Sequence, residues 1–339
     1  MPQVPSITRR RASGLLAAAL IPAAWAQPVR QFTIATGDLA GTYYPLGGIL
    51  ANVLTAPPGG EPCRPAELCG VPGLVAVAQT SEGSVANAEA LAAGTVDSAF
   101  LQADVADAAR AGRGIFAGAP VPDLRALASL YPEVVQLVVR RAERARPQRL
   151  AAGALRSGTR LSAPVVLPAF GIDPGAIELV DLNPSRALAG IEAGELDGFL
   201  TIAGTPTTAV GEALARGDME LAAVDAKAAR RLVGAGSHWR LDVLAAGLYP
   251  GLEATPSLAV PALWAVRADL DDDLVRQLLT ALWSPAALAA LAAGHPAGRE
   301  IAPATALRGL SLPLHHAARD FYRAEGLLAA PEAVPHAEG

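Results

Sequence analysis

The residues best suited to chemistry in this chain are hydroxyls, side-chain amides and backbone N–H groups in short glycine-rich turns. The first such turn, residues 37–42, follows an apolar run at 32–36 and precedes an apolar segment that Pro45 opens. A strand, turn and helix in this order direct backbone N–H groups and the positive helix end at one point, which favours an anion. Many α/β proteins contain such turns, so a purely structural role is the alternative for this stretch alone.

The same pattern recurs further along the chain. Residues 74–79 read as a buried strand, and the polar loop 80–84 leads into a helical segment. Ser84 suits the N-cap of that helix, which leaves the other polar side chains of the loop free to face a ligand. A third hydroxyl-rich loop at 156–160 also precedes a helix, and we expect its Arg160 to point to solvent.

An internal repeat indicates how these turns are arranged. Residues 91–101 have a counterpart 100 residues later, at 191–201. Each copy reads as a helix stopped by glycine, a turn that contains aspartate, and a buried strand. The predicted fold class is therefore α/β, with two related lobes and a ligand cleft between them at the carboxyl ends of their strands.

Both strands of the repeat lead into polar residues. The first delivers Gln102 and Asp104, and the second delivers a turn with Gly204 and Thr205, in which Thr205 is expected to cap the next helix. Asp104 would repel a bare carboxylate, so we expect it to orient a neighbouring donor or to meet an ammonium group.

The first 26 residues have the features of a secretory signal peptide. Three arginines at 9–11 precede an apolar run at 14–24, and residues 24–26 form a small-x-small cleavage site before Gln27. The apolar run is too short to span a bilayer, so we expect export to the periplasm. The arginines leave both the ordinary and the twin-arginine routes open.

The size and charge of the remaining chain suggest a two-domain protein. Its 313 residues (339 minus 26) are too many for one compact core, and we expect lobe 1 at 27–138 and 250–339 and lobe 2 at 139–249. The formal charge falls from −5 to −8 when the three arginines are removed, and no long basic tract remains. We therefore expect no nucleic-acid partner. No later segment reads as a membrane span, and we expect a monomer.

The expected connection between the lobes contains two strands, at 124–131 and 134–140, separated by Pro132. The charged stretch at 140–149 follows them. It reads as a solvated linker whose arginines pair with Glu143.

Two clusters of metal-ligand residue types have structural explanations. Asp269 and residues 271–273 lie where a helix is expected to begin, and acidic residues complement the helix dipole there. His315 and His316 lie in a tail, 274–328, that reads as helical throughout, where adjacent histidines diverge. We therefore expect no metal site and no cofactor.

Cys63 and Cys69 are the only cysteines, and they lie in a loop rich in proline and glycine. In an exported protein a disulfide between them is the favoured interpretation. The alternatives are a nucleophilic cysteine, which needs a nearby base, and a metal site, which needs more soft ligands than this loop offers.

Short motifs along the chain together resemble the TAXI family of solute receptors. These motifs lie at 40–47, 83–87, 102–104, 130–133, 157–159, 194–199, 249–251, 312–315 and 321–322. The resemblance implies the extracytoplasmic receptor of a tripartite ATP-independent periplasmic (TRAP) transporter. It also implies a type II periplasmic binding-protein fold, membrane-embedded permease partners and small carboxylate ligands. Cys63 and Cys69 match a paired-cysteine loop of one branch of that family.

Two residues near the expected cleft depart from the family pattern. Arg156 stands where the family usually has glycine, and Glu82 lies in a loop that is usually glycine-rich. We expect them either to reshape the pocket, or to pair with each other across it, or to lie at its solvent rim.

The leading hypothesis is a binding protein that captures a small anionic or zwitterionic carboxylate and delivers it to a TRAP-type permease. The recurrent loops contain no lysine and only Arg156 and Arg160 lie nearby, so neutral donors at helix starts are expected to hold the ligand. The candidate ligand-binding residues are Thr36, Gly41, Thr42, Tyr43, Thr80, Ser81, Ser84, Asn87, Gln102, Asp104, Tyr131, Ser157, Gly158, Thr159, Gly204 and Thr205. The alternatives are a sensor without a transporter and an enzyme on the same scaffold, for which no nucleophile, base and acid set is evident.

Overall fold

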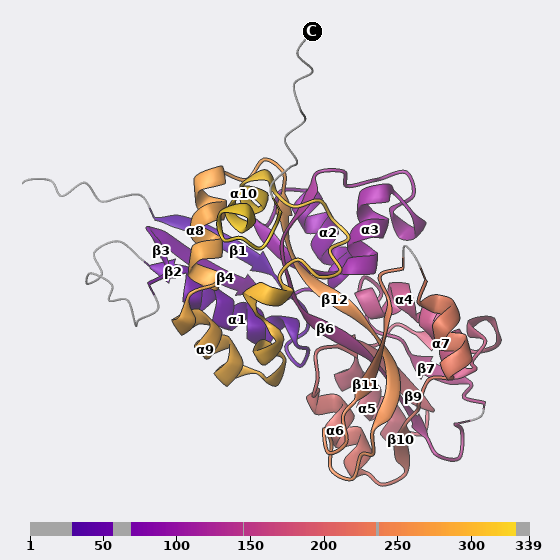
Figure 1. Ribbon diagram of the computed structural model, residues 1–339. Coiled ribbons are helices and arrows are strands. Elements are labelled where there is room, and N and C mark those ends of the chain that lie inside the picture. Colours follow the sequence, from indigo (N-terminus) through magenta and orange to yellow (C-terminus); the bar gives the residue numbers. More distant parts are fainter. Residues whose placement is uncertain (1–28, 57–68, 145, 235–236, 330–339) are drawn as a thin grey trace, which may run out of the picture.

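Two lobes joined by long strands make up the structure (Figure 1). The computed structural model describes residues 29–56, 69–144, 146–234 and 237–329. The expected signal peptide and Cys63 lie outside these ranges. Lobe 1 begins with β1 (Arg30–Ala35), α1 (Tyr43–Leu54), β2 (Thr55–Ala56), β3 (Val71–Pro72), β4 (Leu74–Gln79), α2 (Ser84–Ala92), β5 (Ser98–Gln102), α3 (Ala103–Ala111) and the 3-10 helix η1 (Gly114–Phe116).

The chain then passes to lobe 2 and returns. The strand β6 (Leu124–Arg140) leads into β7 (Arg149–Ala151), α4 (Gly158–Val166), η2 (Leu167–Phe170), η3 (Pro174–Ala176), β8 (Glu178–Val180), α5 (Pro184–Glu192), β9 (Gly198–Ala203), α6 (Thr208–Ala215), β10 (Met219–Leu221), α7 (Ala226–Leu232) and β11 (Arg240–Leu244). The return strand β12 (Thr255–Arg267) precedes α8 (Asp272–Leu282), α9 (Pro285–Gly294), η4 (Pro296–Glu300), η5 (Pro303–Thr305) and α10 (His316–Ala324).

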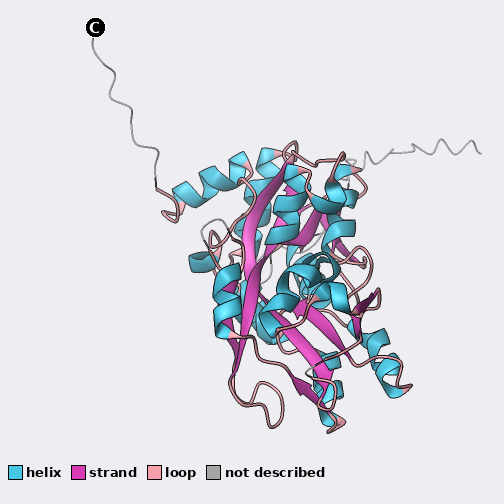
Figure 2. Cartoon of the chain, turned by 90° about the vertical axis from the view of Figure 1, so that its right-hand side faces the viewer, coloured by secondary structure: helices cyan, strands magenta, loops and turns pink. Residues whose placement is uncertain are grey.

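One sheet runs through both lobes, with its strands in the order β3-β2-β4-β1-β5-β12-β6-β9-β7-β8. β6 and β12 pair antiparallel with each other and extend from one half to the other (Figure 2). In lobe 1, β12 also pairs with β5; in lobe 2, β6 pairs with β9 and β10, and β12 pairs with β11. The predicted α/β fold with two lobes is confirmed.

β6 is a single strand of 17 residues, so the two separate strands expected from the sequence are wrong. Pro132 lies inside it and faces Pro261 of β12, next to a register shift between Pro261 and Leu263. Proline cannot donate to a sheet ladder and is tolerated at such an irregularity. The strand therefore continues past Pro132 from one lobe into the other.

The internal repeat is confirmed, and its aspartates have the same role in both lobes. Asp97 accepts a hydrogen bond from the backbone N–H of Thr33 in β1, at 2.7 Å. Asp197 accepts one from the backbone N–H of Arg149 in β7, at 2.9 Å. Each aspartate thus connects the turn before its own strand to the neighbouring parallel strand.

α1 places the first glycine-rich turn over the end of β1. Leu46, Leu50 and Leu54 recur every four residues and are buried against the core, each contributing roughly 2 kcal/mol. Gly47 lies so close to β1 that a Cβ there would be 2.3 Å from Cγ2 of Thr36. The close packing fixes where the turn points.

The tail is not helical throughout, which corrects the expectation for 274–328. Proline begins α9, η4 and η5, and it separates each of them from the helical segment before it, because proline cannot continue a preceding helix. Among the described residues no single helix is long and apolar enough to cross a membrane, although α8 and α9, bent by 63°, meet that requirement as a pair by length and composition.

The arginines of the stretch at 140–149 also pair differently from the expectation. Arg141 and Arg144 each lie 3.1 Å from the carboxylate of Glu220, rather than pairing with Glu143. The reason is that β10, which carries Glu220, pairs with the end of β6.

Candidate ligand-binding site

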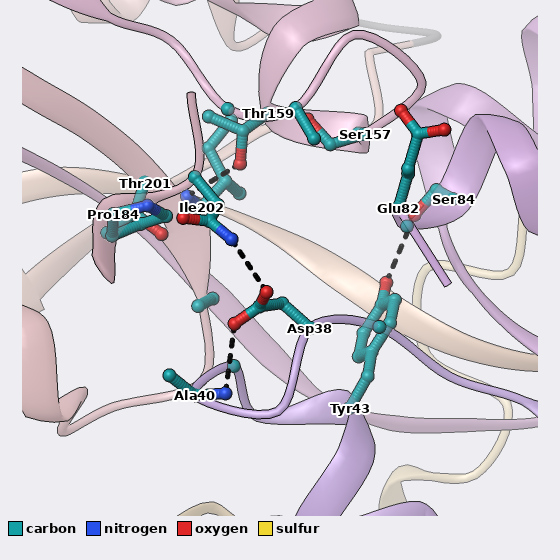
Figure 3. Close-up of a pocket in the computed structure, with 18 of the residues that line it drawn as sticks. Asp38, Ala40, Tyr43, Glu82, Ser84, Ser157, Thr159, Pro184, Thr201 and Ile202 are labelled. Carbon is teal, nitrogen blue, oxygen red and sulfur yellow. Dashed lines mark hydrogen bonds between the residues drawn. The ribbon is translucent and has the colours of Figure 1, made fainter. Parts of the chain in front are cut away.

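A cavity of about 410 Å³ lies between the two lobes, at the carboxyl ends of strands from both (Figure 3). Lobe 1 and β6 contribute Gly37, Asp38, Ala40, Gly41, Thr42, Tyr43, Ser81, Glu82, Gly83, Ser84, Gln102 and Glu133. Lobe 2 contributes Gly153, Ala154, Leu155, Ser157, Gly158, Thr159, Asp181, Asn183, Pro184, Ser185, Arg186, Thr201, Ile202, Ala203, Thr207 and Ala209. Ligands of α/β proteins bind at this edge of the sheet.

Hydrogen bonds around Tyr43 form the wall on the side of lobe 1. The Tyr43 hydroxyl donates to the carboxyl group of Glu133 at 2.7 Å. It also lies 3.3 Å from the Ser84 hydroxyl (Figure 3). Ser84 accepts a hydrogen bond from the backbone N–H of Gln102 at 3.0 Å. The ring of Phe100 contacts Tyr43 edge-on, with 5.6 Å between centroids. Tyr43 is therefore held in one orientation beside the cavity.

Two helix starts form the wall on the side of lobe 2. Ser157 caps α4 by accepting from the backbone N–H of Arg160, at 3.1 Å, and Asn183 caps α5 by accepting from that of Arg186, at 2.9 Å. The Thr159 hydroxyl accepts from the backbone N–H of Ile202 at 3.1 Å, which holds α4 against β9. The positive ends of α4 and α5 suit acceptor oxygens of a ligand.

The lobes contact each other around the cavity, so the structure is a closed form. The Thr42 hydroxyl donates to the carbonyl oxygen of Gly204 at 2.8 Å. The Asn183 amide donates to the carboxylate of Asp38 at 2.6 Å (Figure 3). Both bonds join lobe 1 to lobe 2.

Two glycines permit this close approach. A Cβ at Gly158 would lie 2.1 Å from Oε1 of Gln102. A Cβ at Gly204 would lie 2.7 Å from Cγ2 of Thr42 and 2.8 Å from Cε2 of Tyr131. A larger residue at Gly204 would hold the lobes apart, because packed groups surround it on several sides.

Arg156 of lobe 2 forms ion pairs with two glutamates of lobe 1. Its guanidinium lies 3.2 Å from Glu82 and 2.8 Å from Glu89, and all three side chains are more than 40% exposed. The two residues that depart from the TAXI pattern therefore pair with each other, and they do so at the solvent rim.

The cations near the cavity differ from those expected. Arg160 does not point freely to solvent, because its guanidinium pairs with Asp181 at 2.5 Å. Arg186 lines the cavity, so the expectation that Arg156 and Arg160 are the only nearby cations is wrong. The cavity thus has one arginine in its lining that the sequence analysis did not include.

Nine of the sixteen predicted ligand-binding residues line the cavity. They are Gly41, Thr42, Tyr43, Ser81, Ser84, Gln102, Ser157, Gly158 and Thr159. The seven that do not line it are Thr36, Thr80, Asn87, Asp104, Tyr131, Gly204 and Thr205.

Most of the seven have structural roles close to the cavity. The Asn87 amide donates to the carbonyl oxygens of Thr36 and Phe100, at 2.6 and 2.8 Å, and so ties α2 to the ends of β1 and β5. Asp104 accepts from the Ser162 hydroxyl of lobe 2, at 2.5 Å, and therefore joins the lobes beside the cavity. Thr80 is exposed.

Two predicted helix caps are wrong. Gly83, not Ser84, is the N-cap of α2, and Ser84 is its first helical residue, with a hydroxyl that faces Tyr43. Thr207, not Thr205, precedes α6, because Pro206 extends the turn after β9.

Sequence reasoning missed Glu133, Asn183 and Arg186. Glu133 belongs to a motif used for the TAXI resemblance, and it is the one acidic residue of β6, which was the available signal. The Asn-Pro pair at 183–184 is a helix-start signal that follows the short strand β8.

Burial controls the protonation of the two inner carboxyl groups. It raises the pKa of Glu133 well above its usual value, although the hydrogen bond from Tyr43 opposes this. Burial also raises the pKa of Asp104, against the hydrogen bonds from Ser162 and Gln102. Both groups therefore hold a proton more readily than a carboxyl group in water.

Asp272, His315 and His316 meet at the starts of α8 and α10, where the histidines were expected to diverge. Their ligand atoms lie within 4.8 Å of one another, and the histidine rings stack with centroids 4.3 Å apart. His315 is the extended N-cap of α10, so the helical geometry does not apply to the pair. Its Nδ1 accepts from the backbone N–H of Ala317. Two positive helix ends disfavour a cation here, and we assign no metal site.

A model of the NMT1-like family matches residues 34–326. The chain belongs to this family. Solved structures similar to this NMT1-like chain include SsuA, an alkanesulfonate-binding protein from Xanthomonas axonopodis pv. citri bound to MOPS, at 16% identity and a TM-score of 0.46 over 90% of this chain and 96% of that chain.

Two further structures are similar to a comparable extent. MatC from Rhodopseudomonas palustris, with bound malate, is 16% identical, with a TM-score of 0.45 over 78% of this chain and 85% of that chain. The periplasmic nitrate-binding protein NrtA from Synechocystis is 13% identical, with a TM-score of 0.48 over 78% of this chain and 62% of that chain.

Proposed function

We propose that this chain is a solute-binding protein that captures a small anionic or zwitterionic carboxylate between its lobes and delivers it to a TRAP-type permease. The observation that carries the proposal is the cavity of about 410 Å³, closed by hydrogen bonds from one lobe to the other. A cavity of this size suits a small solute. Closure around the solute gives a permease a surface that differs between the free and the loaded protein.

The carboxylate part of the proposal is supported by the wall in lobe 2. The starts of α4 and α5 converge there, and Arg186 lies beside them. Ser157, Gly158 and Thr159 at the start of α4 are our candidates for donors to the carboxylate oxygens.

A binding role is favoured over catalysis by the chemistry of the cavity. Its described lining contains no histidine, cysteine or lysine, and none of the serine or threonine hydroxyls in that lining donates to a carboxyl group. A nucleophile without a base is weak at neutral pH.

The finer parts of the proposal rest on the sequence. The TAXI motifs support a TRAP permease as partner, residues 1–26 support export to the periplasm, and we propose a monomer. We also retain lobe 1 at 27–138 and 250–339 and lobe 2 at 139–249 as proposed bounds.

Native mass spectrometry of protein purified from the periplasm tests the proposal, together with calorimetry on a panel of small carboxylates. We expect a bound small solute that contains a carboxylate. The proposal is wrong if no small solute co-purifies and no carboxylate of the panel binds.

A further inference from the structure

Among the charged residues that the structure describes in the cavity lining, only Glu133 is buried. It lies on β6, where this strand passes between the lobes, and only 3% of its surface is exposed. Its partner is the Tyr43 hydroxyl, and it forms no ion pair with any residue in the described part of the chain. A buried carboxylate without a cation is costly.

The other acidic residues of the lining already have partners. Glu82 pairs with Arg156, and Asp181 pairs with Arg160. Asp38 accepts hydrogen bonds from Asn183 and from a backbone N–H. One buried carboxyl group therefore remains without a positive partner inside the cavity, while the start of α5, which includes Arg186, lines the wall of lobe 2.

We propose that Glu133 determines ligand specificity by forming an ion pair with a protonated nitrogen of the ligand. This inference rests on the proposed function, because it concerns the same cavity. A ligand with an ammonium or similar group would supply the cation that Glu133 lacks. The starts of α4 and α5 would hold its carboxylate on the opposite wall. The ligand class is thus zwitterionic rather than purely anionic, and Glu133 takes the role that the sequence suggested for Asp104.

The groups that face Glu133 are consistent with this assignment. They are Tyr43 on α1, Tyr131 on β6 and Asp104 on α3, and none of them is positively charged. Burial raises the pKa of Glu133, so its carboxyl group takes up a proton more readily than one in water. A ligand cation favours the ionised form, so its binding lowers this pKa again.

Calorimetry on the mature protein with carbon-matched compounds tests the inference. The pairs are glutamate with glutarate, aspartate with succinate, and 4-aminobutyrate with butyrate, and putrescine represents an amine without a carboxylate. We expect an amino compound to bind at least about 10-fold more tightly than its partner without nitrogen. The inference is overturned if the compound without nitrogen binds as tightly as its amino counterpart, or more tightly. It is also overturned if neither the panel nor the molecule that co-purifies with the protein provides a binder with a basic nitrogen.

A variant locates the effect at Glu133. Glu133→Gln keeps the shape of the side chain and an acceptor for Tyr43, and we expect it to weaken binding of the amino compound by about 30-fold or more. Glu178→Gln, at an exposed glutamate outside the cavity, is the matched control and should leave binding unchanged. Unchanged binding by Glu133→Gln overturns the inference, and the compound pairs test it without any variant if Glu133→Gln does not fold.

The pattern of binding separates failure of this inference from failure of the proposed function. Binding of glutarate or succinate without binding of any amine overturns the inference and leaves a carboxylate receptor. Binding of putrescine alone supports the inference and contradicts the carboxylate. Absence of any binder contradicts both.

Discussion

The Thr42 hydroxyl donates to the carbonyl oxygen of Gly204, 162 residues further along the chain. Both groups lie in turns at strand ends, one in each lobe. The bond therefore exists only when the lobes are closed. Thr42 was expected to donate to the ligand, but its hydrogen is used within the protein, so Thr42 acts on the equilibrium between open and closed forms.

Replacing Thr42 by valine should weaken ligand binding without removing a ligand contact. The change leaves the Gly204 carbonyl without its donor in the closed form, which costs about 1 to 3 kcal/mol. Binding measured by calorimetry should weaken by about 5- to 150-fold. Thr42→Ser retains a hydroxyl and should bind almost normally, and wild-type affinity in Thr42→Val would contradict this account.

Gly204→Ala should hold the lobes apart. Its Cβ would lie within 3 Å of Thr42, Tyr131 and Ala297, so the closed form would need rearrangement on several sides. In small-angle scattering we expect the wild-type radius of gyration to fall on saturation with ligand and that of Gly204→Ala to stay large. Gly211→Ala is a matched control, because the nearest atom to its Cβ is at 3.8 Å. A normal decrease in Gly204→Ala would refute the role of this glycine.

Arg156→Ala should weaken ligand binding only slightly, and high salt should abolish the difference from wild type. The ion pairs with Glu82 and Glu89 are exposed, and such pairs contribute about 0.2 to 1 kcal/mol at low ionic strength. We expect ligand affinity to fall less than about fivefold at low salt and to match wild type at high salt. Arg149→Ala, which breaks a pair within lobe 2, should not change affinity. A large loss that persists in high salt would show that Arg156 contacts the ligand.

Glu133→Gln should change how stability depends on pH. The pKa of Glu133 is raised in the folded protein, so above its unfolded value of about 4.3 the folded state binds more protons than the unfolded state. Glu133 therefore costs stability as pH rises from about 4.3 toward its folded pKa. Thermal unfolding of the ligand-free variant should lose less stability than wild type between pH 5 and 7. Parallel curves would contradict this assignment.

Cys63 and Cys69 should be bonded in the exported protein. A loop this small contributes less than about 3 kcal/mol, so its reduction should loosen the segment around it without unfolding the lobes. Alkylation of periplasmic protein without reductant should label neither thiol, and reductant should expose both. Labelling of both thiols before reduction would rule out the bond.

The glycine-rich turns and the repeat could be read from the sequence because their signals are local. Gly94 and Asp97 lie within a few residues of the strand that they help to place, and the same spacing recurs at Gly194. Partners of polar side chains were not predictable in this way. The Thr42 hydroxyl and the Asn87 amide look free in the sequence, but each bonds to a carbonyl oxygen that the folded sheet brings near.

Glu133 shows a second limit of sequence reasoning. Its neighbours in β6 are apolar, and nothing local indicates that both lobes converge on this part of the strand. Its position in the cavity depends on the pairing of β6 with both β12 and β9.

Pro132 of β6 and Pro261 of β12 face each other where the two strands pass between the lobes. The two strands remain paired on both sides of this point, so we expect the lobes to reorient by a change of twist in a two-stranded ribbon. The apparent affinity depends on the fraction of molecules that can close. Substitutions beside Pro261, at Val260 or Ala262, should therefore change the affinity for every solute together, while Glu133 and the other cavity residues that distinguish one solute from another stay the same.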